Sequence, residues 1–290
     1  MTMASTRLSM AIGNTPQTAA LLSGAVAAPG LAIDFHDLAA TPDAFKRMVR
    51  NLEFDLCELA IVTFLQAREH GKPLVLLPIT MLGRFPLNQI VCRADRMDIT
   101  PETLSGRRIG VRSWTKTTGV WVRAILIDEF GFDPDSVHWF SFEEPHVAEY
   151  TDPTERVGDG RTIFQMLLDG EIDVAIGEVS NDPRLRPLFA DPIEAVKGWH
   201  ANRGIVPINH MMVATSALIR TRPGIAATIY DLIRRSRDAA PAVAGVDMTP
   251  LGLGANRASL AWCLDHAARQ RLISRRVTVD ELFDETMRAL

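Results

Sequence analysis

The sequence predicts an α/β protein of two lobes, each a mixed, mostly parallel β-sheet flanked by helices, joined by two hinge strands. Three observations lead to this prediction. Short apolar runs alternate with helix-like segments, which is the pattern of α/β folds with largely parallel sheets. This alternation occurs in two successive series, with a crossing near residues 91–94 and a returning apolar run near 208–213. The length of 290 residues is sufficient for two domains.

The first series of elements occupies residues 7–93. Its expected strands are short apolar or alternating runs, and its expected helices carry apolar residues at helical spacing. The strands are 7–13, 31–38, 56–61, 74–79 and 89–93, and the helices are 17–23, 42–52 and 62–70. In 31–38, for example, apolar residues alternate with Asp34 and His36, which is the period of a strand.

The second series begins after residue 106 and is followed by three helices. Its strands are 108–112, 137–142 and 174–176, its helices are 117–130 and 163–169, an extended apolar run covers 204–219, and the final helices are 224–239, 257–271 and 279–290. We therefore expect a first lobe of residues 1–93 plus 212–290 and a second lobe of residues 94–211. In such an arrangement a ligand is expected between the lobes.

Composition excludes several classes of protein. A net charge of −4 argues against a nucleic-acid-binding protein, and no apolar stretch approaches the ~18–20 residues of a membrane span. The three cysteines have no paired spacing, which excludes a disulfide scaffold or zinc finger and fits a reducing cytoplasm. The apolar stretch 19–28 is similar to a signal-peptide core, but polar residues 14–18 split the N-terminal apolar residues into two short runs and only Arg7 precedes them as a charged residue, so we expect a cytoplasmic protein.

A set of sequence motifs, in order along nearly the whole chain, resembles one enzyme family. The motifs are FDLCELA (54–60), LSGRRIGV (104–111), GVWVRAIL (119–126), EEP (143–145), GEIDVAI (170–176), PINHMMV (207–213), PLGLGANR (250–257) and RLISRRVTVDELF (271–283). As a set they resemble the 4,5-dihydroxyphthalate decarboxylase family. The resemblance implies a periplasmic-binding-protein type 2 fold, a cytoplasmic location and decarboxylation of a small hydroxylated aromatic (di)carboxylic acid.

The chain also departs from the pattern of this family at several positions. The departures are Leu87 and Asn88, the segment Arg112-Ser113-Trp114, His146, and Gly177-Glu178. These differences bear on the substrate and on the chemistry more than on the fold. The alternative hypothesis is therefore a non-catalytic, transporter-type binding protein for a small organic anion, because such a protein needs only a cleft and an anion site.

Decarboxylation of a hydroxylated aromatic acid requires a base for the ring hydroxyl proton and an acid for the ring carbon. His210, in the returning apolar run, matches a histidine of the family and can exchange a proton near neutral pH. Glu58 lies in an apolar strand, where a carboxylate needs a partner. His146 follows the EEP motif on an expected loop and could supply a second acid or base. Each residue also has a purely structural alternative: His210 could be a core histidine, Glu58 a strand-end carboxylate, and His146 a solvated loop residue.

Carboxylate binding requires cations or backbone N–H groups. Arg84 lies on a loop and suits bidentate carboxylate binding, and it matches the family. Arg112, Lys116 and Thr117 surround the start of the helix 117–130, where free N–H groups attract anions, although Thr117 could simply cap the helix.

Two further residues are weaker candidates for substrate binding. Asn14 matches the family and could donate to a ligand oxygen or shape its turn, and His36 could contribute from the first lobe. A divalent metal held by His36, Glu58, His146 and His210 is possible, but no ligand spacing indicates one, so we predict neither a metal nor another cofactor. The expected partner is the small aromatic carboxylate alone, with a homodimer possible through the C-terminal helices.

Overall fold

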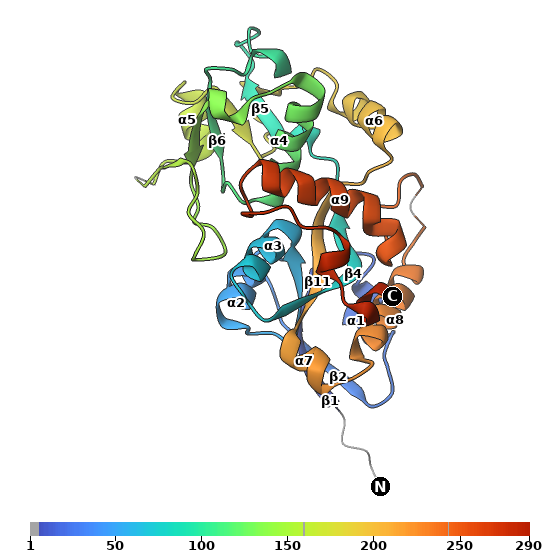
Figure 1. Ribbon diagram of the computed structural model, residues 1–290. Coiled ribbons are helices and arrows are strands. Elements are labelled where there is room, and N and C mark those ends of the chain that lie inside the picture. Colours follow the sequence, from blue (N-terminus) through green and yellow to red (C-terminus); the bar gives the residue numbers. More distant parts are fainter. Residues whose placement is uncertain (1–5, 159, 243) are drawn as a thin grey trace. The chain divides into compact units, whose positions relative to one another are not determined.

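The computed structural model describes residues 6–158, 160–242 and 244–290. The chain divides into two compact units (Figure 1). Unit 1 contains the described residues up to Gly83 together with Ile208–Leu264 and Arg275–Leu290, and unit 2 contains Arg84–Pro207 and Asp265–Ser274. No helix among the described residues has the length and apolar character required to cross a membrane.

Unit 1 is built on a five-stranded sheet in the order β2-β1-β3-β11-β4. The strands are β1 (Thr6–Ala11), β2 (Leu31–Phe35), β3 (Leu56–Ala60), β4 (Leu74–Gly83) and β11 (Ile208–Thr215). β1 runs parallel to β2 and β3, whereas β11 is antiparallel to both of its neighbours. The start of β11 therefore lies at the edge of the sheet where β3 and β4 end.

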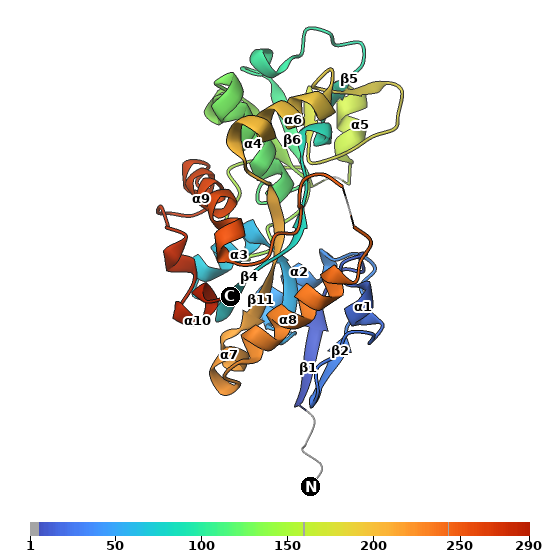
Figure 2. The same cartoon turned by 90° about the vertical axis from the view of Figure 1, so that its right-hand side faces the viewer.

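Helices cover both faces of the unit 1 sheet (Figures 1 and 2). They are α1 (Ala19–Leu22), α2 (Asp43–Asn51), α3 (Ile61–Glu69), α7 (Ser216–Thr221), α8 (Ile225–Asp238), the first part of α9 (Leu253–Arg269), and α10 (Glu285–Arg288). α2 and α3 lie on one face, and α8 lies on the other. The enclosed side chains, such as those of Met10, Leu59 and Met211, are completely buried.

Unit 2 is built on a six-stranded sheet in the order β10-β5-β9-β6-β7-β8. The strands are β5 (Ile90–Arg93), β6 (Arg108–Val111), β7 (His138–Ser141), β8 (Glu155–Arg156), β9 (Val174–Ile176) and β10 (Leu185–Pro187). β9, β6, β7 and β8 are parallel, and β5 is antiparallel to β9 and β10. The carboxyl ends of the central strands therefore meet at one edge.

The helices of unit 2 are α4 (Thr117–Phe130), α5 (Ile163–Leu168) and α6 (Pro192–Arg203), with short 3₁₀ turns at Leu87–Gln89, Pro101–Thr103 and Pro134–Ser136. α4 ends at Gly131, whose positive φ of 63° suits the left-handed turn that terminates a helix. α5 packs its apolar residues, including Met166 and Leu167, against Val91 and Ala175 of the sheet.

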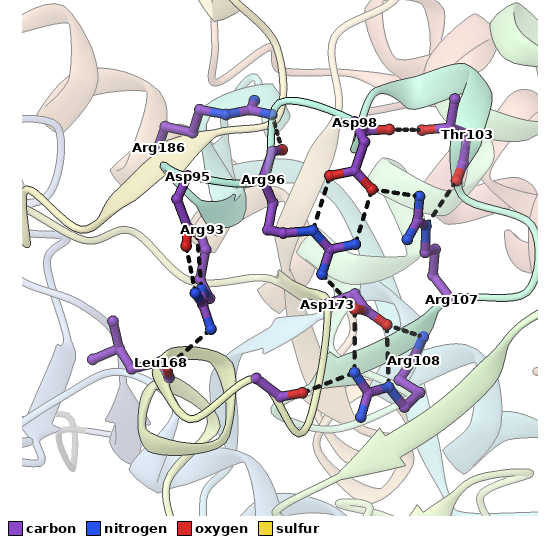
Figure 3. A network of polar contacts seen from close by, with 11 residues as sticks. Arg93, Asp95, Arg96, Asp98, Thr103, Arg107, Arg108, Leu168, Asp173 and Arg186 are labelled. Atoms are coloured by element: carbon purple, nitrogen blue, oxygen red, sulfur yellow. Dashed lines mark hydrogen bonds and ion pairs between the residues drawn. The ribbon is translucent and has the colours of Figure 1, made fainter.

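An ion-pair network fixes one side of unit 2 (Figure 3). Asp173, before β9, accepts hydrogen bonds from the backbone and the guanidinium of Arg108 and lies 3.4 Å from Nη1 of Arg96. Arg96 also forms two hydrogen bonds with Asp98, which in turn pairs with Arg107. Burial alone would raise the pKa of Asp173, but the contacts with Arg108 and Arg96 outweigh it and lower that pKa.

Several expected elements differ from the structure. The expected helix 279–290 is wrong: a 3₁₀ turn (Asp280–Leu282) and α10 replace it, because Phe283 is extended and Asp284 caps a new helix. α6, β8 and β10 were not expected. The predicted lobe boundaries were 93/94 and 211/212, whereas the units change at 83/84, 207/208, 264/265 and 274/275. β5 lies in unit 2 because it pairs with β9 and β10.

Candidate active site

A buried Glu–His pair lies in the sheet of unit 1. Oε1 of Glu58 is 2.7 Å from Nδ1 of His210, and the two side chains are only 5% and 12% exposed. A carboxylate can only accept hydrogen bonds, so Nδ1 of His210 is the donor. This contact leaves the second ring nitrogen, Nε2, which has no hydrogen-bond partner in the described part of the chain.

Strand register brings these two residues together. β11 pairs antiparallel with β3 so that His210 lies opposite Ala60 and Met212 lies opposite Glu58. Residues two positions apart in a strand share a face, so Glu58 and His210 are diagonal neighbours on one face of the sheet. The register between β11 and β4 shifts on both sides of His210, which marks an irregularity in the ladder at this residue. Such irregularities often re-aim a side chain near a functional site.

The loop after β1 holds the other oxygen of Glu58. The backbone N–H of Gly13 donates to Oε2 over 2.9 Å, so both carboxylate oxygens have a donor. The buried hydroxyl of Thr18 in turn donates to the carbonyl of Gly13 over 2.6 Å. A Cβ atom at Gly13 would lie 2.6 Å from Oγ1 of Thr41 and 3.3 Å from Oε2 of Glu58. Glycine at this position therefore permits the close approach of the loop to the carboxylate.

An aromatic ring fixes the plane of the imidazole. Phe45, buried on α2, meets the ring of His210 edge to face, with centroids 5.0 Å apart and planes at 87°. Glu58, Gly13 and Phe45 thus restrain His210 from three elements of unit 1. A histidine with one nitrogen held by a carboxylate and the other available is suited to general acid–base catalysis.

The remaining unit 1 candidates are placed differently from this pair. Asn14 is exposed on the loop beside Gly13. His36 follows β2 and packs edge to face on Phe54, with centroids 4.6 Å apart. Asp34 of β2 pairs with Arg7 of β1. The structure brings His36 into contact with neither Glu58 nor His210 among the interactions it describes.

The unit 2 candidates gather where β6, β7 and β9 end. Arg112 directly follows β6, and its Nε is 2.7 Å from Oε1 of Glu143, which lies two residues after β7. His146 is half-buried on the loop that continues from Glu143. Thr117 is buried in the first turn of α4. The predicted residues of this unit therefore share one edge of the sheet, as parallel β/α topology dictates.

Lys116 is the most constrained cation at this edge. Its Nζ donates to the carbonyl of Gly177 over 2.7 Å and lies 3.2 Å from Oε1 of Glu178, both of which follow β9. Burial lowers the pKa of Lys116, the charge of Glu178 opposes that shift, and the charges of Arg112 and Arg84 reinforce it. Arg112 and Arg84 therefore each disfavour the charged form of Lys116.

Arg84 is the third cation of the group. Its Nη2 donates to the buried hydroxyl of Thr118 on α4 over 2.9 Å. Burial of the guanidinium lowers the pKa of Arg84, and the charge of Glu178 opposes the shift. Within the described ranges of the chain, Arg84 forms no ion pair at salt-bridge distance. Most of its N–H donors therefore remain available for an anion.

Sequence reasoning missed three residues of these groups. Gly13 and Phe45 restrain the Glu58–His210 pair, and Glu178 pairs with Lys116. The only signals in the sequence were the glycine after a strand and the departure from the family pattern at Gly177-Glu178. Among the described residues, no group of three or more His, Cys, Asp or Glu side chains could hold a metal ion.

No protein-family model matches the chain, but two curated relatives do. The 4,5-dihydroxyphthalate decarboxylase of Comamonas testosteroni is 29% identical over 251 residues, which cover 81% of this chain and 76% of the relative. The 4,5-dihydroxyphthalate decarboxylase of Pseudomonas putida is 29% identical over 209 residues, which cover 67% of this chain and 81% of the relative.

Solved structures confirm the predicted fold. The alkanesulfonate-binding protein SsuA of Xanthomonas axonopodis pv. citri superposes with a TM-score of 0.57 at 13% identity, covering 96% of this chain and 97% of that one. The desulfurization enzyme DszB superposes with a TM-score of 0.54 at 15% identity, and the match covers 98% of this chain and 97% of DszB. At these identities the likeness concerns the periplasmic-binding-protein fold alone, which carries both binding proteins and enzymes. The sequence relatives and the motifs make the chain similar to the 4,5-dihydroxyphthalate decarboxylases, which are carboxy-lyases.

Proposed function

We propose that this protein is a cytoplasmic decarboxylase of a small hydroxylated aromatic carboxylic acid, of the kind named in its relatives. The observation that carries the proposal is the contact between Glu58 and His210, which restrains one ring nitrogen and leaves Nε2 for proton transfer. The relatives named as decarboxylases supply the reaction class.

The chemistry assigned to His210 is transfer of one proton. Nε2 accepts the proton of a ring hydroxyl, and the resulting electron density at the carboxylate-bearing carbon allows that carbon to be protonated by the imidazolium. The bond between the ring carbon and the carboxylate then breaks, its electron pair returns to the ring, and carbon dioxide leaves. The imidazole is neutral again at the end of the cycle, and the reaction consumes one solvent proton overall.

Glu58 acts through His210 in this scheme. Its Oε1 keeps the proton on Nδ1, so that Nε2 is the basic nitrogen, and it stabilises the imidazolium that forms during turnover. The Gly13 N–H holds the carboxylate in the required orientation. Arg84, Arg112, Lys116 and Thr117 remain our candidates for carboxylate binding, with His146 as a candidate second acid or base and Asn14 and His36 as weaker ones.

The test is turnover of a compound panel by the purified protein. The panel contains 4,5-dihydroxyphthalate and the dihydroxybenzoates, and the readouts are released carbon dioxide and the aromatic product by chromatography. Decarboxylation of at least one compound, absent from heat-denatured protein, is the expected result. If no compound is turned over while several raise the melting temperature, the protein is the non-catalytic binding protein instead.

A further inference from the structure

A buried hydroxyl on the loop after β1 is not used by the proposed chemistry. Thr18 is only 2% exposed and occupies the N-cap position of α1, where a threonine side chain ordinarily accepts a hydrogen bond from the first turn of the helix. Among the described residues, the side chain of Thr18 caps no N–H of α1, and its backbone is helical, with φ of −105° and ψ of −11°, where a capping residue is usually extended. The hydroxyl therefore serves something other than the start of this helix.

The Thr18 hydroxyl is directed back into the loop. Of the two carbonyls to which it can donate, that of Gly13 at 2.6 Å is closer than that of Thr15 at 3.2 Å, so its only proton is assigned to Gly13. Its oxygen accepts from the backbone N–H of Thr15 over 2.9 Å. The backbone N–H groups of Thr18 and Ala19 both donate to the carbonyl of Thr15 over 3.0 Å, which closes the loop further.

These bonds hold both polar backbone groups of Gly13. Its N–H donates to Oε2 of Glu58 over 2.9 Å, while its carbonyl accepts from Thr18. Because a glycine has no side chain to restrict φ and ψ, a bond at one of these groups alone leaves the other free to turn. Glu58 binds Nδ1 of His210 with its second oxygen. A continuous series of hydrogen bonds thus joins the hydroxyl of Thr18 to the imidazole.

We infer that Thr18 is a positioning residue, whose hydroxyl holds the Gly13 N–H on Glu58. Through this carboxylate it sets the orientation of the His210 imidazole. The inference rests on the proposed function and extends it to the loop after β1. Displacement of a reacting group by about 1 Å can lower a rate about 10²-fold, so a hydroxyl that acts through two other residues can still affect turnover.

The competing role for this hydroxyl is to shape the turn that carries Asn14. Asn14 is exposed, directly follows the carbonyl of Gly13, and is a candidate for substrate binding. A hydroxyl that serves Asn14 would change KM when it is removed, whereas a hydroxyl that serves Glu58 would change kcat. The two roles are therefore separated by which kinetic parameter responds.

The test removes the hydroxyl at nearly constant shape. Thr18→Val leaves the Gly13 carbonyl and the Thr15 N–H without this partner, and Thr18→Ser restores the hydroxyl. The matched control is Thr215→Val, because Thr215 is a buried N-cap threonine at the other end of β11 from the imidazole, and its hydroxyl accepts from the N–H of Leu218. The readouts are kcat and KM for a compound of the panel that is turned over, and the exchange rate of the Gly13 amide by NMR.

We expect kcat of Thr18→Val to fall about tenfold or more, with KM changed much less. Thr18→Ser should recover most of this loss, and Thr215→Val should keep the wild-type kcat. The Gly13 amide should exchange about fivefold faster or more in Thr18→Val, which is the scale of one lost hydrogen bond. An unchanged kcat in Thr18→Val, or a rise of KM alone, would overturn the inference, and so would an unchanged exchange rate at Gly13.

Two further comparisons keep the test decisive. If Thr18→Val does not fold, the smaller Thr18→Ala repeats it. In the wild type, the Gly13 amide should exchange much more slowly than that of the exposed Asn14, and similar rates would refute the bond to Glu58. Exchange needs no turnover. Absence of turnover of every compound would therefore refute the proposed function, and the Gly13 exchange rates would still decide whether Thr18 holds this amide on the carboxylate.

Discussion

Glu58 and His210 are separated by 152 positions in the sequence, yet Oε1 of one lies 2.7 Å from Nδ1 of the other. The contact exists because β11 returns antiparallel beside β3 and places both residues on one face of the sheet. Burial of both side chains strengthens the hydrogen bond and makes loss of either partner costly.

The Glu58→Gln variant tests the role of this carboxylate. The amide can no longer stabilise an imidazolium and can present its NH₂ to Nδ1, so the proton moves to Nε2. We expect kcat to fall about 10²-fold or more, with KM changed much less. A steady-state comparison across pH, on protein with a wild-type circular dichroism spectrum, checks this. If Glu58→Gln has the kcat and the pH profile of the wild type, Glu58 has a structural role only.

The Gly13→Ala variant tests the close approach of the loop to Glu58. The new methyl group would lie 2.6 Å from Oγ1 of Thr41 and 3.3 Å from Oε2 of Glu58, so one of them must move. We expect about 1–3 kcal/mol of destabilisation, the scale of overpacking, together with a loss of activity. The double variant Gly13→Ala/Thr41→Ala removes the closer clash and should recover part of the stability. If the single variant Gly13→Ala has the same free energy of unfolding and the same activity as the wild type, the loop is not constrained at this position.

The Asp173→Asn variant tests the ion-pair network of unit 2. Asn keeps the shape of the side chain but loses its charge towards Arg108 and Arg96, so we expect a loss of about 1–3 kcal/mol near pH 7. The pKa of Asp173 is lowered in the folded state, so its charge stabilises the fold above the ordinary carboxyl pKa of about 4 and ceases to do so as the pH falls through the folded value. In denaturant unfolding at several pH values, the free energies of unfolding of the wild type and Asp173→Asn should converge below about pH 4. A difference in this free energy that persists at acid pH would assign the effect to packing instead.

The Arg123→Ala variant tests a fully buried cation in α4. The guanidinium stacks 3.8 Å from the ring centroid of Trp114, and it donates to the carbonyl of Trp114 and to Gln270. Its removal leaves a cavity and two unpaired acceptors, and we expect the free energy of unfolding to drop by about 3–5 kcal/mol. Lys197→Ala, at an exposed position of α6, is the control and should change stability by less than about 0.5 kcal/mol. A similar effect of both substitutions would contradict the importance of the Arg123 stack.

Local sequence signals were sufficient for several elements and failed where tertiary contacts decide. The helix 117–130 was predicted with the bounds that α4 has, and Gly131, in the left-handed conformation, follows its last residue in the structure. The Asp191-Pro192 pair is a helix-start signal that was overlooked, and it begins α6. The expected helix 279–290 failed because Phe283 packs in the core in an extended conformation, which no periodicity reveals.

The candidate site was predictable as a set of residues and not as a geometry. Glu58 could be singled out as a carboxylate in an apolar strand, and His210 as a histidine in another. Their contact depends on the register between β3 and β11, which a sequence does not encode locally. The same holds for Glu178, since its pairing with Lys116 arises only when the loop after β9 meets the start of α4.

The most direct test of the central claim is the decarboxylation rate of His210→Ala beside that of His36→Ala. Both variants remove an imidazole from unit 1, but only His210 contacts Glu58. Carbon dioxide release should fall about 10²-fold or more in folded His210→Ala protein, assayed well below its melting temperature, and by less than about tenfold in His36→Ala. A folded His210→Ala protein that releases carbon dioxide at the wild-type rate would contradict the account.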